Sequence, residues 1–410
     1  MLNVVVLNGG RGAATLIPAL LARRGLNVTS VVNAYDDGKS TGAIRRFFGM
    51  LGPSDLRKVQ ELMLPQDDPD LAAHRHWFRY RYPLDVDRAA VLADLTDFAR
   101  GAADALAGAR SGNARVVAGM RAFVAAFLRG LALIEPVIGE PFDFADCSVM
   151  NCVFAGAFLA HDRNMEEATL ALDRLFRLTG TVLPTSIENK QLVALRENGE
   201  ILYCEAEIVE LRSNVRIDRV YLLDRPLDRD RFERLSLADK RAYLDLHHCF
   251  VGVSAGVERA LRAADLIIYA AGTQHSSLYP TYLATGLAGA IADNRRAFKA
   301  FITNIGADYE TPSYRASDYL RGAYRYLCLS TRRDFAVREL FDVALINASR
   351  IKADETYVTF DADNFGDLPV ELAVGAFESA ERPGQHDGER IVAELLRRYE
   401  ARDTDHGAAA

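Results

Sequence analysis

The sequence lacks the cysteine pattern of a disulfide-rich or zinc-binding protein. It has five cysteines, an odd number, and none of them forms a Cys-x-x-Cys pair. Disulfide frameworks and structural zinc sites both use paired cysteines at short spacings. We therefore expect reduced, mostly buried thiols in a cytoplasmic protein.

The chain also lacks a strong excess of one charge and a long unbroken apolar run. Its 49 basic and 56 acidic residues give a net charge of -7, which creates no field that attracts nucleic acid or anionic membranes. The most apolar long stretch, residues 120–139, is interrupted by Arg121, Arg129 and Glu135. We expect no nucleic-acid partner, no signal peptide and no membrane span, and small-molecule chemistry becomes the favoured class.

What the chain does have is an opening alternation of apolar strands and helices. Half of its 410 residues are hydrophobic, enough for one large core. Residues 3–7 predict a buried strand, 8–12 a tight loop, 15–24 a helix and 28–33 a second buried strand. This order is typical of a βαβ unit with a right-handed crossover. The predicted class is α/β, a Rossmann-like three-layer sandwich with a mainly parallel sheet and a helical insertion.

The rest of the chain predicts further elements in a single domain over residues 1–382. Alanine and leucine at three- and four-residue intervals indicate a helical insertion at about 84–140. Expected helices cover 42–48, 54–64, 88–106, 114–133, 151–159 and 164–175, and expected strands cover 192–196, 201–208, 216–223, 265–269, 300–304 and 343–347. Residues 197–199 predict a hairpin turn. Residues 383–410 are expected to form a C-terminal helix and a frayed tail.

The first candidate site is the glycine loop after the first strand, with Gly9, Gly10, Arg11 and Gly12. Glycines let the backbone approach a phosphate, and the N-terminus of the following helix favours an anion. The third glycine of a dinucleotide fingerprint is replaced by Thr15, so the match is incomplete. A sharp strand-to-helix turn without a ligand is the alternative.

The second candidate site follows the second strand and combines Asp36 and Asp37 with the run Gly38-Lys39-Ser40-Thr41. Two adjacent carboxylates repel each other in a partly dry site unless a cation or N–H groups compensate, and Mg²⁺ between carboxylate and diphosphate is the obvious partner. An Asp-Gly turn at the sheet edge is the alternative. A Walker A loop is disfavoured because its first glycine position holds Asn33.

Two further clusters bear on that choice. Residues 52–58 place Asp55 and Arg57 at a helix start, where Ser54 or Asp55 could also be an ordinary N-cap. Residues 269–280 run from a buried strand into a hydroxyl-rich loop, at the edge where open α/β sheets bind ligands. Capping by Ser276 or Ser277 is the alternative there.

Taken in order, these segments resemble the 2-phospho-L-lactate transferase (CofD) family, and most closely its gluconeogenesis-factor (YvcK) branch. The similar stretches are 9–12 (Gly-Gly-Arg-Gly), 36–45 (Asp-Asp-Gly-Lys-Ser-Thr-Gly-Ala-Ile-Arg), 52–58 (Gly-Pro-Ser-Asp-Leu-Arg-Lys), 78–82 (Phe-Arg-Tyr-Arg-Tyr), 148–151 (Ser-Val-Met-Asn), 180–184 (Gly-Thr-Val-Leu-Pro), 199–208, 272–277 (Gly-Thr-Gln-His-Ser-Ser) and His386-Asp387. The resemblance covers nearly everything except the insertion.

The resemblance implies a Rossmann-like sheet that holds a nucleoside diphosphate group. The catalytic branch uses Mg²⁺ to transfer a phospho-acyl group from a guanosine diphosphate conjugate to a deazaflavin alcohol, and the regulatory branch is associated with UDP-sugar binding and envelope homeostasis. By this resemblance Asp36 and Asp37 are the expected metal ligands and, with His275, the expected catalytic residues. The residues expected to bind nucleotide and phosphate are Gly9, Gly10, Arg11, Gly12, Lys39, Ser40, Thr41, Asp55, Arg57, Asn151, Gly272, Thr273, Gln274 and Ser276.

Departures from the family sequence leave two hypotheses open. Lys39 stands where the family has glycine, and Gln274-His275 stands where it has Leu-Tyr, so the site gains a cation and an imidazole. These additions favour a Mg²⁺-dependent transferase that acts on a nucleotide-diphosphate-linked small molecule or sugar, UDP- or GDP-linked. The motif wording favours a non-catalytic UDP-sugar sensor. A dehydrogenase is a weaker third hypothesis, and the insertion could form the surface of a homodimer.

Overall fold

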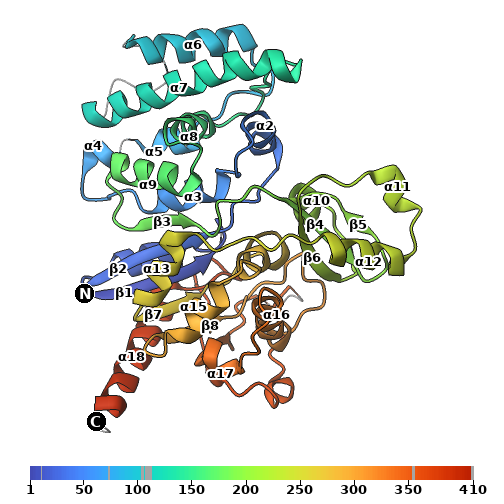
Figure 1. The fold of residues 1–410 in the computed structure, drawn as a ribbon. Coiled ribbons are helices and arrows are strands. Elements are labelled where there is room, and N and C mark those ends of the chain that lie inside the picture. Colours follow the sequence, from blue (N-terminus) through green and yellow to red (C-terminus); the bar gives the residue numbers. More distant parts are fainter. Residues whose placement is uncertain (11, 73, 103–105, 107–112, 353–355, 408–410) are drawn as a thin grey trace.

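Seven parallel strands form the main sheet of the protein (Figure 1). The computed structural model describes all residues except 11, 73, 103–105, 107–112, 353–355 and 408–410. Across the sheet, the strands are β10 (Glu371–Gly375), β9 (Val343–Asn347), β8 (Phe298–Ile302), β7 (Leu266–Tyr269), β1 (Leu2–Asn8), β2 (Leu26–Val32) and β3 (Thr181–Pro184). This confirms the predicted α/β, Rossmann-like class.

Helices follow most strands and cover the sheet, as parallel connections require. The helices outside the insertion are α1 (Leu16–Leu21), α2 (Lys39–Phe48), α3 (Ser54–Leu62), α4 (Pro69–Ala72), α5 (Arg75–Arg79), α8 (Val149–Ala160), α9 (Met165–Phe176), α10 (Glu205–Glu210), α11 (Arg229–Glu233), α12 (Leu237–His247), α13 (Ala255–Ala263), α14 (Tyr279–Tyr282), α15 (Leu287–Asp293), α16 (Ala316–Leu329), α17 (Val337–Leu340) and α18 (Gly388–Gly407). A π-helical turn, η1 (Gln274–Leu278), precedes α14, and a 3-10 turn, η2 (Ala362–Phe365), precedes β10.

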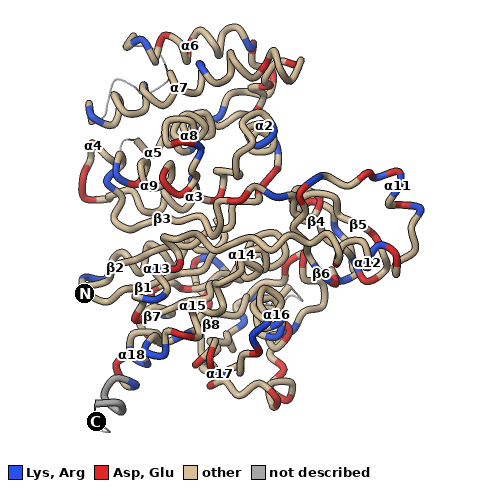
Figure 2. The backbone as a smooth tube through the Cα atoms, in the orientation of Figure 1, with Lys and Arg blue, Asp and Glu red and all other residues tan. Residues whose placement is uncertain are grey.

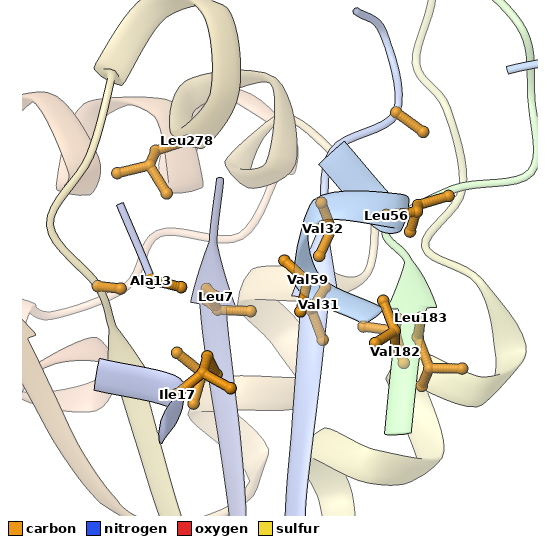
Figure 3. Close-up of a cluster of buried hydrophobic side chains, with 14 of the residues drawn as sticks. Leu7, Ala13, Ile17, Val31, Val32, Leu56, Val59, Val182, Leu183 and Leu278 are labelled. Carbon is orange, nitrogen blue, oxygen red and sulfur yellow. The ribbon is translucent and has the colours of Figure 1, made fainter. Parts of the chain in front are cut away.

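The buried core joins the first three strands to their covering helices. Figure 3 shows Leu7 of β1, Val31 of β2 and Val182 of β3 in one cluster with Ile17 of α1 and Val59 of α3. Each of these five side chains is fully buried. Continuous apolar strands of this kind predict a sheet covered on both faces, and the structure has one.

The insertion forms an antiparallel helix pair, α6 (Arg88–Arg100) and α7 (Ala114–Ile138), at the top of Figure 1. Its α7 packs against α8, and α6 packs on α7. Gly101, with φ of 96°, ends α6 earlier than the expected residue 106. Among the described helices α7 is long and apolar enough to cross a membrane, but a core helix that packs on neighbours passes the same test, so the prediction of no membrane span stays a prediction.

A second, antiparallel sheet has the order β5 (Ile201–Leu202), β4 (Gln191–Arg196) and β6 (Ile217–Leu223). Gly199, with φ of 89°, makes the predicted turn between β4 and β5. The prediction of one strand over 201–208 is wrong, because β5 ends at Leu202 and α10 begins at Glu205. Basic and acidic segments are interspersed over the described backbone, in both sheets and in the insertion (Figure 2).

Other element boundaries differ modestly from the expectation. The helix predicted at 15–24 is only α1, because Ala22 ends it, and α2 begins at Lys39 rather than at residue 42. Strands β3 and β10 were not predicted. The C-terminal helix α18 extends to Gly407, beyond the expected residue 399, and the last three residues of the expected tail lie outside the described residues.

Candidate functional site

The largest candidate site is a cavity of about 460 Å³ at the carboxyl ends of β1, β2 and β7, where open α/β sheets bind ligands. The residues that line it are Gly9, Gly10, Gly12, Asp36, Gly38, Lys39, Thr41, Ser54, Asp55, Arg57, Lys58, Arg81, Asp146, Glu205, Ala206, Val209, Glu210, Thr273, Ser276 and Ser277. Ten predicted site residues are among them. Arg11 lies outside the described residues.

The glycine loop is confined by its neighbours. A Cβ on Gly10 would overlap the Asp55 carboxylate and approach Lys58, and a Cβ on Gly12 would overlap the carbonyl oxygen of Ala271. These two positions therefore require glycine because of packing, whichever ligand the loop binds. The same packing brings Asp55 and the loop after β7 to the cavity.

The two aspartates of the loop after β2 point to different partners. Asp36 lines the cavity, and its Oδ1 accepts a hydrogen bond from the N–H of Gly38 at 3.0 Å. Asp37 is not a lining residue: its Oδ1 accepts from the N–H of Ala206 at 3.0 Å, and its Oδ2 lies 3.9 Å from Arg45. Asp37 thus fastens the start of α10, so the assignment of both carboxylates to one metal is corrected to Asp36.

Glu205 takes the place beside Asp36 that Asp37 was expected to take. It lines the cavity, and burial, followed by the charges of Asp36, Asp37 and Asp55, raises its pKa to about 9. Burial and the Asp55 charge likewise raise the pKa of Asp36. Glu205 was missed although it matches the glutamate of the family stretch over 199–208, because that stretch was interpreted as a strand.

A magnesium ion fits this cluster only with help from its ligand. Among the described residues, no group of three or more His, Cys, Asp or Glu side chains could hold a metal ion alone. Mg²⁺ is usually bound by one or two carboxylates together with substrate phosphates and water. Asp36 and Glu205 meet that requirement, and their raised pKa values show that a cation here would relieve repulsion.

Four cations lie on the cavity wall. Lys58 is 2.7 Å from Asp55, and Asp146 holds two others, Lys39 at 3.1 Å and Arg81 at 2.6 Å. Lys39 has φ of 48°, a left-handed conformation that favours glycine. Arg81 lies in a family-like stretch but was not chosen, and nothing in the sequence singles out Asp146.

Arg57 is the most deeply buried of these cations, at 7% exposed. It donates to the carbonyl oxygen of Phe78, and its Nε has no hydrogen-bond partner. Burial, and then the charge of Arg81, lowers its pKa. Pro53 is the N-cap of α3, so the alternative that Ser54 or Asp55 is an ordinary N-cap is wrong.

The loop after β7 supplies hydroxyl groups to the cavity but few free N–H groups. Thr273, Ser276 and Ser277 line it. However, Glu310 accepts from the N–H groups of His275 and Ser276 at 2.8 and 2.9 Å, and from Ser276 Oγ at 2.5 Å. These backbone donors were expected to meet a phosphate, and the protein's own carboxylate occupies them instead.

His275, Gln274 and Gly272 belong to that loop but do not line the cavity. The His275 ring is 1% exposed and packs on Tyr279 and Tyr314, and burial lowers its pKa to about 3, so it is neutral. Gln274 donates to the carbonyl oxygen of Gly272. We therefore give His275 no role as a reacting group.

Asn151 and Ser40 act behind the cavity wall. Asn151 Nδ2 donates to Ser40 Oγ at 3.2 Å and to Thr41 Oγ1 at 3.5 Å, which fixes the first turn of α2 against α8. Of these three, only Thr41 lines the cavity. The predicted ligand-binding roles of all these residues stay predictions.

Comparison with known proteins places this site in a family. A family model described as 2-phospho-L-lactate transferase CofD matches residues 4–377. A Thermotoga maritima protein named "Putative gluconeogenesis factor" is 25% identical over 327 residues, 80% of this chain and 76% of that protein. A Listeria monocytogenes protein named "Gluconeogenesis factor" is 24% identical over 402 residues, 96% of this chain and 94% of that protein.

The fold has solved counterparts. A crystal structure of a Bacillus halodurans protein covers 96% of this chain and 99% of its own, with a TM-score of 0.64 and 20% identity. That likeness supports the fold alone. The match of the family model over most of the chain carries the identification. This chain belongs to the 2-phospho-L-lactate transferase CofD family, and its named relatives are gluconeogenesis factors.

Proposed function

We propose that the protein is a Mg²⁺-dependent transferase that acts on a nucleotide-diphosphate-linked small molecule or sugar and releases a nucleoside monophosphate. The observation that carries the proposal is the charge arrangement in the cavity. Arg57, Lys58 and Arg81 lie on its wall, and the carboxyl groups of Asp36 and Glu205 lie in the same space. Cations suit the phosphates, and carboxyl groups suit the metal that bridges them.

Arg57 supports an anionic ligand most strongly. A buried guanidinium with an unpartnered Nε pays for desolvation without full compensation, and within the described residues it forms no ion pair. A diphosphate would supply the missing acceptor. Lys58 is near enough to share that anion, because it lines the same wall.

Phosphoryl transfer requires alignment and charge neutralisation more than a covalent nucleophile. Mg²⁺, when bound, would neutralise part of the charge that develops on the phosphate oxygens. Arg57 and Lys58 would orient the diphosphate. An acceptor hydroxyl would form the new bond to phosphorus while the bond to the nucleoside monophosphate breaks, and Asp36 would take the hydroxyl proton, since burial raises its pKa.

A non-catalytic UDP-sugar sensor is the second candidate. Two observations favour it: the relatives are named gluconeogenesis factors, and the one histidine predicted to be catalytic faces tyrosines rather than the cavity. A sensor would use the same cavity but would transmit occupancy to a partner protein. It would bind the conjugate without consuming it.

Release of UMP or GMP from candidate conjugates in the presence of Mg²⁺ and a panel of alcohol acceptors distinguishes the two. The transferase predicts product release that Asp36→Asn abolishes. Asp67→Asn is the matched control, because Asp67 is an exposed aspartate outside the lining of the cavity. Saturable binding of UDP-sugars with no turnover across the panel would refute the transferase and support the sensor.

A further inference from the structure

A second cavity, of about 400 Å³, lies against the first one. Gly10, Arg57, Lys58 and Arg81 line both cavities and therefore form the wall between them. On the far side of this wall, the lining includes Arg79 and Glu61. This second cavity is unaccounted for by the binding of one nucleotide conjugate.

The lining of the second cavity is rich in positive charge. Arg57, Lys58, Arg79 and Arg81 line it, and the one carboxylate among its lining residues is Glu61. Glu61 is paired with Arg79. Lys58 and Arg81 find their carboxylates, Asp55 and Asp146, among the residues of the first cavity. Several cations converging on one concave surface favour a phosphate or a carboxylate.

Arg57 gives an independent indication of a ligand. Its side chain is 7% exposed, it lines both cavities, and its Nε lacks a partner. Its other recorded donor group is fixed on the carbonyl oxygen of Phe78, which also lines the second cavity. Buried donors are almost always satisfied, so the free Nε points to an acceptor that arrives with a ligand.

Apolar side chains complete the second cavity. Leu62 and the fully buried Phe78 lie beside the cations. A pocket that combines an apolar floor with a few convergent polar groups is typical of small-molecule sites. Its size suits a metabolite rather than a polymer.

We propose that the second cavity is an anion-binding subsite that takes a small molecule bearing a phosphate or carboxylate group, bound at the same time as the ligand of the first cavity. Arg57, Lys58 and Arg81 contact both ligands from opposite sides of the shared wall. Arg79 contacts only the second ligand. The proposal does not depend on turnover in the first cavity.

Two exposed cations allow a matched test, because each lines only one cavity. Arg79 lines the second cavity and is 68% exposed; Lys39 lines the first and is 70% exposed. Neither Arg79→Glu nor Lys39→Glu places a charge in the core. Calorimetric titration with inorganic phosphate, in the presence and absence of saturating UDP and Mg²⁺, measures the second cavity, and titration with UDP and Mg²⁺ measures the first.

Phosphate is expected to bind the UDP-saturated wild type, and Arg79→Glu should weaken it by about tenfold or more while the affinity for UDP changes less than about twofold. Lys39→Glu should show the reverse, and Glu61→Gln should tighten phosphate. Loss of phosphate binding on UDP saturation, or equal weakening by both reversals, would overturn the subsite. If UDP does not bind at all, the proposed function fails, and the phosphate titration of Arg79→Glu still decides the subsite by itself.

Discussion

Replacement of Glu205 by glutamine should stabilise the protein, and more so at higher pH. The pKa of Glu205 is raised from 4.5 to about 9, because the carboxyl is buried beside Asp36, Asp37 and Asp55. A carboxyl with a raised folded-state pKa contributes its stability below pH 4.5, the unfolded value, and loses that stability as pH rises towards 9. Glutamine removes the ionisable group and therefore this loss.

The magnitude follows from the shift. At pH 7.5 the unfolded carboxyl is ionised about 3 pH units above its pKa while the folded one still holds its proton, a difference of roughly 4 kcal/mol at about 1.36 kcal/mol per unit. Solvent at the cavity mouth lowers this, so we expect a gain of about 2 kcal/mol in the free energy of unfolding. At pH 4.5 the gain should approach zero.

Urea unfolding at pH 5 and pH 8, in EDTA, tests this expectation. Glu210→Gln is the control, because Glu210 is an exposed glutamate on the same helix and also lines the cavity. A Glu205→Gln variant that is equally stabilised at both pH values, or destabilised more at pH 8, would refute the burial of a protonated carboxyl at this site. A pH-dependent gain would show that stability is sacrificed for a functional carboxylate.

Three more substitutions test the frame of the cavity. Gly10→Ala should lower the free energy of unfolding by about 1–3 kcal/mol in urea denaturation, because the added methyl overlaps Asp55, whereas Gly25→Ala, with no atom near its Cβ but φ of 85°, reports backbone strain alone. Glu310→Ala should cost about 2–4 kcal/mol by the same measurement, since two N–H groups and a hydroxyl lose their acceptor, and an unchanged stability would show that the η1 turn needs no anchor. Arg45→Met should cost about 3–5 kcal/mol in thermal unfolding, because Asp37 is left without its ion pair and three backbone carbonyl oxygens lose a donor; a loss below about 1 kcal/mol would contradict this.

The sequence predicts the central strands well because burial on both faces leaves a continuous apolar run. β1, β2 and β7 each lie within two residues of their expected bounds. Strand β3 has only four residues and ends in proline, so its local sequence carries little signal, and its pairing with β2 is visible only in the folded chain. The end of α6 at Gly101 is an αL cap that the sequence analysis overlooked.

The position of the site was predictable because parallel strands end at one edge. Loops after β1, β2 and β7 were expected to meet there, and all three contribute to the cavity. The directions of individual side chains were not predictable, because distant residues set them. Ala206 draws Asp37 away from the cavity, and Glu310 occupies the donors of the His275–Ser276 turn. Arg81 and Asp146 meet Lys39 only through tertiary packing.

The central claim is that the first cavity holds a nucleoside diphosphate group together with Mg²⁺. Calorimetric titration with UDP-glucose and with GDP, each with Mg²⁺ and with EDTA, tests it most directly on wild type and Asp36→Asn. The account predicts that at least one nucleotide binds, that Mg²⁺ tightens it by about tenfold or more, and that Asp36→Asn removes this gain. Absence of binding by both nucleotides, or binding that neither EDTA nor Asp36→Asn changes, would contradict it.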